Sequence, residues 1–396
     1  MSARVALLAI GLSTVMASPI QVLGQADTTT AQGGIYDRPF IGSASGTSVG
    51  GYVEGNTNYF VEDGVTEGFS MELRRFNIFI FSSISRRVRF LSELEFEHGT
   101  EEIALETALV DFQINPYLTL RAGILLPPLG YHNQNHDSPK WEFVDRPLVS
   151  TDVIPSTLSE VGGGAYGSFN NADLTFTYDL YVTNGLADGV VDNGLGRTDI
   201  ASGKSDEAFG EDNNGSPAVS GRLAARHRRL GEVGVSYYGG NYNSFRAEGE
   251  EVDERRWLSI AAVDAGGEVG PVRLRGEVAR AKIDIPPGLT EVFGGTQWAG
   301  HLDAVATVWR PTISGYEEAV LNVALRVERI DYNVGTFSST GDDIRDDVIA
   351  LVPAVSFRPS SGTVFRINYR RHWTRDFVGN PTNRLGGWQL GFATYF

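Results

Sequence analysis

Charged side chains occupy every second position in several short stretches of this 396-residue sequence, opposite apolar ones. In "VRLRGEV", Arg273, Arg275 and Glu277 alternate with aliphatic residues, and in "VFRINYR", Arg366 and Arg370 do the same. Side chains of a strand alternate between two faces, so each stretch predicts a strand with one charged and one apolar face. A guanidinium is a permanent two-pronged donor for anions, and carboxylates attract cations. The pattern therefore predicts non-covalent contact with charged solutes.

The same alternation assigns ten arginines and eight acids to the polar face of the whole sheet. The arginines are Arg89, Arg121, Arg222, Arg226, Arg228, Arg273, Arg275, Arg326, Arg366 and Arg370, and the acids are Glu93, Glu95, Glu97, Asp179, Glu232, Glu277, Asp303 and Glu328. If the sheet closes around a lumen, seven of the arginines are candidate lining residues: Arg89, Arg121, Arg273, Arg275, Arg326, Arg366 and Arg370. The near balance of arginines and acids predicts only a slight preference for anions. For each of these residues, a structural ion pair is an equally good interpretation as contact with a solute.

Covalent or metal chemistry has weaker support. His132, His136 and Asp137 have spacing found in some metal sites, but "YHNQNHD" has the composition of a loop, where this spacing does not place both rings on one face. No phosphate-binding glycine loop, dinucleotide motif or nucleophile elbow is present in the sequence. We expect no cofactor, no metal site and no enzymatic activity.

Sixteen stretches with period-two alternation, bounded by turn residues, are predicted as strands. They span about 46–60, 68–81, 86–98, 102–114, 117–126, 160–169, 172–184, 217–229, 231–243, 253–265, 270–283, 295–310, 317–333, 346–358, 363–377 and 385–396. The second and fourth are ambiguous, because Phe79 and Phe81 fall in the opposite register to Phe76, Ile78 and Ile80. No helical period of useful length occurs. The fold class is therefore all-β.

Short and long connections alternate along the chain, and the longest are 127–159 and 185–216. This layout is typical of an antiparallel transmembrane barrel with short periplasmic turns and longer external loops. A sheet in lipid must close, since an unpaired backbone group there costs several kcal/mol. A soluble β-sandwich or propeller is the alternative, but it explains neither the alternation of short and long connections nor the apolar face of the last strand.

The last strand ends at the final residue of the sequence. Trp388, Leu390 and Phe392 share one face, which we expect to meet lipid, and Tyr395 and Phe396 are expected in an aromatic girdle at the membrane boundary. These residues form the expected C-terminal signal for membrane insertion. The barrel is predicted over 46–396.

The N-terminus has the pattern of an export signal. One arginine precedes an apolar stretch that is too short to span a bilayer, and small residues at 24 and 26 place a cleavage site after Ala26. We expect 1–26 to be a signal peptide and 27–45 a short periplasmic extension. Cysteine is absent, so no disulfide stabilises the exported chain. A net charge of −16 disfavours nucleic acid as a partner.

Several features lie within about residues 68–170: the pair Arg74 and Arg75, the acidic strand "RFLSELEFEHG", and the motifs "LRAG", "PPLG" and "DRPL". In these features the first half of the chain resembles the phosphate-selective porin O and P family. The resemblance implies a sixteen-stranded, trimeric diffusion porin of a Gram-negative-type outer membrane. Phosphate binders of that family use a lysine cluster, whereas this chain has three lysines, of which only Lys140 lies in the third external loop.

In porins of this kind the third external loop folds inward, which makes 127–159 the candidate constriction. Its charged residues are Asp137, Lys140, Glu142, Asp145, Arg146 and Asp152, and Tyr131, Trp141 and Phe143 could attach it to the wall. The alternative is a loop that covers the mouth without gating.

We therefore expect a porin for small hydrophilic solutes or ions, including anions such as phosphate. Its expected partners are those solutes, membrane lipid and lipopolysaccharide, the assembly machinery of the outer membrane and two further copies of the chain. A closed structural or adhesion barrel and a barrel enzyme that hydrolyses lipid are the alternatives. Conductance, or lipid hydrolysis that depends on one serine, would distinguish them.

Overall fold

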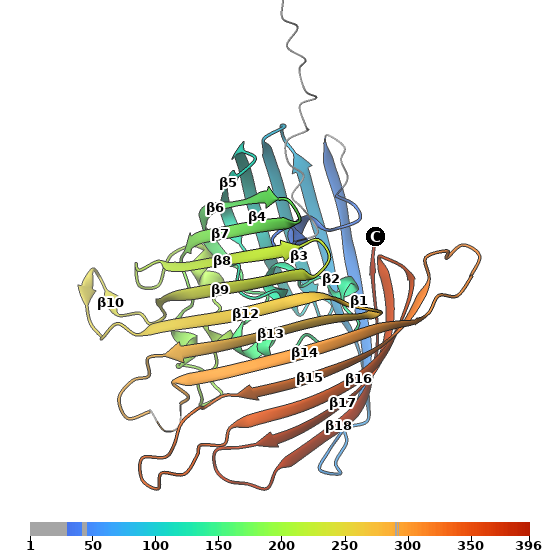
Figure 1. Cartoon of the computed structure of the whole chain (residues 1–396). Coiled ribbons are helices and arrows are strands. Elements are labelled where there is room, and N and C mark those ends of the chain that lie inside the picture. Colours follow the sequence, from blue (N-terminus) through green and yellow to red (C-terminus); the bar gives the residue numbers. More distant parts are fainter. Residues whose placement is uncertain (1–29, 42–45, 290, 292) are drawn as a thin grey trace, which may run out of the picture.

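The computed structural model describes residues 30–41, 46–289, 291 and 293–396, and the signal-peptide prediction for 1–26 lies outside them. Sixteen antiparallel strands close into one barrel, in which β1 pairs with β18 (Figure 1). The strands are β1 (Thr47–Glu62), β2 (Phe69–Ser83), β3 (Val88–Glu97), β4 (Glu102–Asn115), β5 (Leu118–Leu125), β6 (Glu160–Asn171), β7 (Leu174–Thr183), β8 (Ala218–His227), β9 (Gly231–Asn241), β12 (Trp257–Val269), β13 (Val272–Ile283), β14 (Thr296–Trp309), β15 (Val320–Asp331), β16 (Asp347–Ser360), β17 (Thr363–Arg375) and β18 (Asn383–Tyr395). This confirms the predicted fold class and all sixteen strands.

The remaining elements are short. A two-stranded hairpin of β10 (Arg246–Ala247) and β11 (Glu250–Glu251) projects from a loop, and short helical turns occur in the segments between strands. These turns are η1 (Gly34–Tyr36), η2 (His132–Gln134), η3 (Ser138–Lys140), η4 (Val149–Val153), η5 (Asp188–Val190), η6 (Ala201–Gly203) and η7 (Asp206–Phe209). Among the described residues, no helix is long and apolar enough to cross a membrane.

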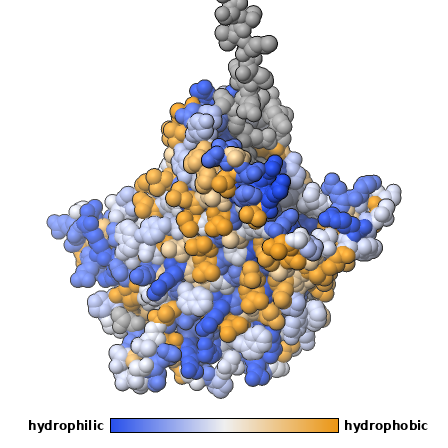
Figure 2. Space-filling view, viewed as in Figure 1, coloured by the Kyte–Doolittle hydropathy of each residue, from blue (hydrophilic) through white to orange (hydrophobic). Residues whose placement is uncertain are grey.

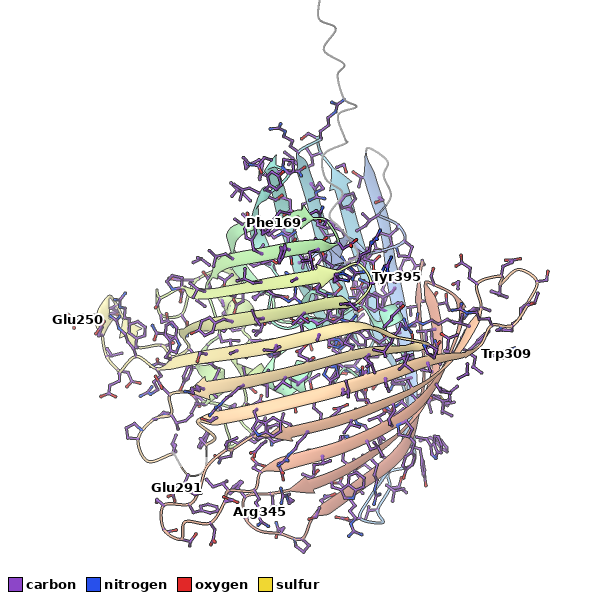
Figure 3. All side chains as sticks on the ribbon, viewed as in Figure 1. Phe169, Glu250, Glu291, Trp309, Arg345 and Tyr395 are labelled. Atoms are coloured by element: carbon purple, nitrogen blue, oxygen red, sulfur yellow. The ribbon has the colours of Figure 1, made fainter. Side chains whose placement is uncertain are left out.

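The two rims of the barrel differ in the length of their connections. One rim carries 126–159, 184–217, 242–256, 284–295 and 332–346, and we call it the long-loop rim. The other, the short-turn rim, carries turns such as 116–117, 172–173, 270–271 and 361–362, together with the longer 310–319. In Figure 3, Glu250, Glu291 and Arg345 mark the long-loop rim, and Phe169, Trp309 and Tyr395 mark the short-turn rim.

The outer face of the wall is apolar. On β18, Trp388, Leu390 and Phe392 are 51%, 48% and 39% exposed, whereas Gln389 between them is buried on the lumen side. The same alternation gives exposed Val323, Leu325 and Val327 on β15. Figure 2 shows hydrophobic side chains over the middle of the wall and hydrophilic ones on the projecting loops. The outer face therefore has the chemistry of a surface that meets hydrocarbon.

Two β-bulges change the alternation of β2 and β4 and account for the ambiguous fourth strand, whereas Phe79 and Phe81 of the second strand lie on the lumen face beyond the bulge. Between Glu54 and Gly55 of β1 the register skips Arg74, so both Arg74 and Arg75 of β2 reach the lumen. An equivalent shift on β4 skips Glu106. An extra residue reverses the alternation beyond it, and the sequence pattern changes register at that point.

Candidate functional site

The loop formed by 127–159 lies inside the barrel, with most of its residues buried. At its start, the Gly130 amide donates to the Ser236 hydroxyl at 2.9 Å. Farther along, the Val144 amide donates to Asn368 Oδ1 at 3.1 Å and the Leu148 amide to Glu328 Oε2 at 3.0 Å. These contacts join strands on opposite sides of the lumen, so the loop crosses the interior.

Glu142 attaches the loop to the wall of β13–β16. Its carboxylate accepts hydrogen bonds from Arg273 at 2.8 Å, from Arg358 at 3.0 Å and from the Ser356 hydroxyl. Burial would raise the pKa of Glu142, but Arg358 and Arg273 outweigh it and lower that pKa. Glu142 is therefore a fixed anion bound to the wall.

Asp145 makes a second attachment, to β2, β17 and β18. It accepts hydrogen bonds from Arg74 at 2.8 Å, Arg370 at 2.5 Å and the Gln389 amide at 2.7 Å. Burial opposes ionisation, but the charges of Arg370 and Arg74 hold the pKa of Asp145 well below its usual range. The side chain remains ionised at neutral pH.

Asp137 binds a residue that precedes the barrel in the sequence. Arg38 donates to its two oxygens at 2.8 and 2.9 Å, and the Tyr395 hydroxyl donates at 2.6 Å. Burial is outweighed by Arg38 and Lys140, so the pKa of Asp137 lies far below its usual range. The expectation of Tyr395 in an outer girdle is wrong: the residue falls on the lumen side of β18 and binds the loop.

The two cations of the loop face its own backbone and the N-terminal segment. Lys140 Nζ donates to the Gly34 carbonyl at 2.8 Å, and burial lowers the pKa of Lys140. Arg146 donates to the Ser156 carbonyl at 2.9 Å and lies 5.5 Å from the Trp141 ring, and burial lowers the pKa of Arg146 as well. Neither side chain reaches an acid of the wall in the described part of the chain. The predicted constriction residues thus lie on one inner loop, where the three acids form separate attachment sites and the two cations bind backbone carbonyls.

All seven predicted lining arginines lie on the lumen side, and most have acidic partners. Arg121 pairs with Asp111 at 2.8 Å, Arg326 with Asp303 at 2.7 Å, Arg366 with Glu54 at 3.1 Å, Arg370 with Asp145 at 2.5 Å, Arg273 with Glu142 at 2.8 Å, and Arg89 approaches Asp111 at 3.6 Å. Arg275 is different, because it lies 3.4 Å from the centre of the Tyr131 ring and makes no ion pair with a described residue. Most of these arginines therefore belong to an internal ion-pair lattice.

The position of the N-terminal segment was not predicted from the sequence. Residues 30–41, expected within a periplasmic extension, lie inside the barrel near the short-turn rim (dark blue in Figure 1). The Ala31 amide donates to Glu232 at 3.2 Å, Gln32 donates to Asp179 at 2.8 Å, and the Tyr36 hydroxyl binds Asp111. Burial and Asp111 raise the pKa of Tyr36 to about 12. The segment follows the wall from β9 to β1 and joins the loop 127–159.

This segment also explains the apolar lumen face of β2. Phe40 stacks on Phe79 at 5.5 Å, Arg38 lies 3.9 Å from the centre of the Phe79 ring, and Tyr36 makes an edge contact with Phe81 at 6.1 Å. Phe79 and Phe81 are buried. Phe76, Ile78 and Ile80 make the outer face of β2 apolar as well. Apolar residues on both faces were therefore a sequence signal that another part of the chain covers β2 from inside.

A hydrophobic cluster occupies the lumen on the other side, toward the long-loop rim. Val149, Val153 and Ile154 of the inner loop and Leu186, Val190 and Ile200 of the next loop pack on inward side chains of β8, β9 and β12–β16. The wall residues include Leu258, Ile260, Ala281, Ile283 and Ile330. An apolar lumen face was not expected. Runs without alternation, such as "LSIAAV" at 258–263, are the sequence signal for it.

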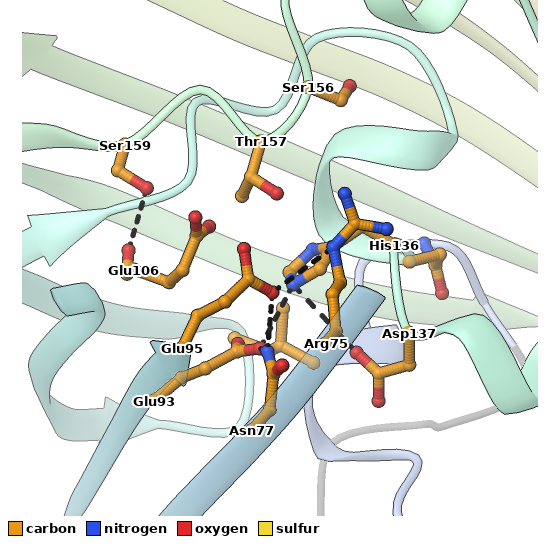
Figure 4. Close-up of polar contacts among 12 residues, drawn as sticks. Arg75, Asn77, Glu93, Glu95, Glu106, His136, Asp137, Ser156, Thr157 and Ser159 are labelled. Carbon is orange, nitrogen blue, oxygen red and sulfur yellow. Dashed lines mark hydrogen bonds and ion pairs between the residues drawn. The ribbon is translucent and has the colours of Figure 1, made fainter. Parts of the chain in front are cut away.

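A buried polar cluster lies between the inner loop and β2–β4 (Figure 4). Asn77 donates to Glu93 and to Glu95, each at 2.7 Å, and His136 Nε2 lies 3.3 Å from Glu93. Ligand atoms of Glu93, His136 and Asp137 lie within 4.8 Å of one another, a spacing that could hold a metal ion. Arg38 already contacts both carboxylates, at 3.4 Å and 2.8 Å. The donor set therefore fits an ion-pair cluster better than a metal site.

A cavity of about 380 Å³ remains between the inner loop and the wall of β8, β9 and β12–β15. Arg226, Arg228, Arg229, Arg273, Arg275 and Arg326 line it together with Lys140, against the acids Glu142, Glu268 and Asp303. Among the described residues, Arg226 and Arg275 have no acid within ion-pair distance. The cavity therefore has a surplus of positive charge.

The C-terminus closes the barrel. The Phe396 amide donates to the Gly51 carbonyl at 3.0 Å, and the Phe396 ring stacks on Phe76 at 5.6 Å on the outer face. Trp388, Leu390, Phe392 and Phe396 thus form one outward apolar row, although their part in membrane insertion stays a prediction.

Comparison with known proteins shows the fold. No protein-family model matches the chain. An uncharacterised protein of Aquifex aeolicus (strain VF5) is 36% identical over 148 residues, which is 36% of this chain and 33% of that protein. The match therefore spans about a third of that relative's length. The resemblance to the phosphate-selective porin family stays a prediction.

Solved structures with similar folds are outer-membrane proteins. OprB of Pseudomonas putida has a TM-score of 0.57 at 9% identity, over 89% of this chain and 94% of that chain. An anion-selective porin from Comamonas acidovorans has 0.56 at 12% identity, over 89% and 100%. OmpT of Vibrio cholerae, in its trimer form, has 0.55 at 10% identity, over 89% and 100%. At these identities the likeness is one of fold alone.

Proposed function

We propose that this chain is an outer-membrane porin through which small hydrophilic solutes or ions diffuse down their gradients. The observation that carries the proposal is the closed sixteen-stranded barrel, apolar outside and charged inside. Closure satisfies the backbone in lipid, and fixed charges in the lumen suit polar solutes. The fold likeness to outer-membrane porins supports the same location, which export by a signal peptide at 1–26 would provide.

We further propose that the channel prefers anions, phosphate among them. Arg226 and Arg275 line the cavity without a described acidic partner, and the Arg273 side chain there is 52% exposed. The carboxylate of Glu142 is already bound by Arg273 and Arg358. Arginines can bind phosphate oxygens in pairs of hydrogen bonds, so the lack of a lysine cluster does not exclude phosphate.

Single-channel recording in a planar bilayer tests this function. We expect stable conductance by the refolded mature chain, and a reversal potential across a KCl gradient whose sign shows chloride preference. Arg226→Gln with Arg275→Gln should move the reversal potential toward cation preference, whereas Arg280→Gln on the outer face of β13 should not. An unchanged permeability ratio in the double variant would overturn the anion proposal.

We also propose that the porin is a homotrimer, since one structurally similar protein is described in a trimer form. Conductance in steps of three, with a particle mass three times that of the chain, is the expected result. A particle of one chain mass would contradict it.

A closed structural barrel is the second candidate, and a specific observation favours it. The hydrophobic cluster and the N-terminal segment occupy much of the lumen. No conductance from correctly folded protein would select this candidate. We assign no covalent reaction to the chain, and lipid hydrolysis that is lost with one serine substitution would overturn that assignment.

A further inference from the structure

Two arginines near the long-loop rim face away from the lumen. Arg371 of β17 and Arg384 of β18 share the outward face of their strands with Tyr369 and Trp388. Neither guanidinium has an ion-pair partner within the described ranges, and Arg371 lies 5.6 Å from the centre of the Trp373 ring. Outward-facing arginine is unfavourable against hydrocarbon, and the cost falls toward the membrane interface. Two unpaired cations at this level indicate an anionic ligand.

These arginines line an outer hollow of about 560 Å³ beside the connection between β1 and β2. Its other lining side chains are Tyr59, Val61, Asp63, Tyr369 and Trp388. The floor is Gly386, where a Cβ would lie 2.6 Å from the Tyr369 hydroxyl oxygen and 2.9 Å from Arg371. Glycine at this position therefore leaves room for the guanidinium to lie against the wall.

The hollow has a net positive charge. Asp63 is its one acid, and the Asp63 carboxylate accepts the Arg384 backbone amide at 3.1 Å. Trp388 is 51% exposed and provides an apolar surface beside the cations. Guanidinium groups bind phosphate through paired hydrogen bonds, and tryptophan is favoured at the level of lipid headgroups.

We propose that this hollow binds the phosphorylated headgroup of lipopolysaccharide in the leaflet on the long-loop side. The proposal rests on the outer-membrane location proposed above. The two guanidinium groups contact a phosphate of the glucosamine headgroup, and Trp388 and Tyr59 pack against its sugar and the start of an acyl chain. Positive charge at the rim complements the phosphates of that leaflet.

Binding of bisphosphorylated lipid A to the full-length mature protein in detergent, measured by native mass spectrometry, tests the site. Arg371→Gln with Arg384→Gln should weaken binding roughly thirtyfold, since each cation near an anionic lipid surface strengthens binding roughly fivefold. The matched control, Arg280→Gln, removes an outward arginine of β13 that lies outside the hollow. It should bind as the wild type does.

Three results would overturn the proposal: equal lipid A binding by the double variant, equal binding of dephosphorylated lipid A, or equal binding of phosphatidylglycerol. The last result would assign the hollow to phospholipid instead. Mobility shift on heating in a gel monitors folding of each variant. Conductance is recorded on the same samples, so a non-conducting protein that binds lipid A would contradict the porin and leave the lipid site intact.

Discussion

His136 is the residue of the inner loop whose charge state the geometry defines most closely. Its Nδ1 lies 3.0 Å from the Asn133 carbonyl and its Nε2 lies 3.3 Å from Glu93, so both ring nitrogens face acceptors. Only a protonated imidazole donates from both nitrogens. Burial and the more distant Arg146 would lower the pKa of His136, but Glu93 and Asp137 raise it.

This pKa predicts a pH-dependent stability. A raised pKa in the folded state gives a stabilisation that is complete below about pH 6.5 and is lost as the pH rises through the folded value. Urea unfolding from pH 5.5 to 9 should therefore show a wild-type barrel that loses stability at alkaline pH. His136→Gln should start less stable and change less over that range. Parallel pH profiles for both proteins would contradict the prediction.

Asp145 connects the inner loop to three strands, so its charge should matter for both stability and conductance. Asp145→Asn leaves Arg74 and Arg370 without this counter-charge and should cost about 1.5–3 kcal/mol, the range for hydrogen bonds to charged groups. The released loop should also increase the noise of the open-channel current. Urea unfolding and bilayer recording measure the two effects.

The control for Asp145→Asn is Glu251→Gln, which changes a carboxylate of the exposed β10–β11 hairpin. Glu251→Gln should leave the free energy of unfolding and the noise of the open-channel current unchanged. Because the pKa of Asp145 is lowered, its contribution to stability is complete at pH 7, begins to decline only near the unfolded pKa of about 4, and is lost progressively as the pH falls from there through the folded value. A loop that detaches near pH 5 would contradict this.

At the scale of elements, the N-terminal segment 30–41 is the part of the lumen that the alternating pattern of the strands does not predict. Residues 30–41 bind Glu232, Asp179, Asp111 and Glu93 of the wall and Asp137 of the inner loop. Deletion of 30–41 should raise the single-channel conductance, because it empties the lumen near the short-turn rim and removes Arg38 from Asp137. Deletion of 246–251 shortens a projecting loop instead and should leave conductance as it is. Equal conductance of the first variant and the wild type would show that the segment lies outside the conducting path.

Alternation made the strands predictable, whereas packing inside the lumen did not follow from it. The charged face of "VFRINYR" and the lipid face of β18 depend on period two alone, so the sequence was sufficient for them. The attachment of Asp137 to Arg38 joins residues 99 positions apart through a segment without periodicity. The strand predicted from 253 begins at Trp257, because Asp253 and Arg256 pair within the loop. Partners of this kind depend on the three-dimensional path of loops, which local pattern does not specify.

At the scale of the molecule, the lumen has two unlike halves. Ion pairs of Arg74, Arg75 and Arg370 fill the side of β1–β4, β17 and β18. The side of β8–β16 holds the hydrophobic cluster toward the long-loop rim and the arginine-lined cavity toward the short-turn rim. Apolar constrictions exclude water and ions, so solutes should pass along the ion-pair side and the arginine-lined cavity rather than through the hydrophobic cluster. Arg75 lies there, 2.6 Å from Glu97, and its side chain is 15% exposed.

A pair of substitutions separates the two halves. Arg75→Gln removes a cation from the polar side and should shift the reversal potential toward cation preference. Ile260→Ala empties part of the fully buried apolar side and should cost about 2–5 kcal/mol of unfolding free energy while leaving the reversal potential unchanged. The two effects are measured on the same samples by bilayer recording and urea unfolding. If Ile260→Ala shifted selectivity and Arg75→Gln did not, solutes would pass through the hydrophobic cluster, and the inner loop would have to move away from β12 for conduction to occur.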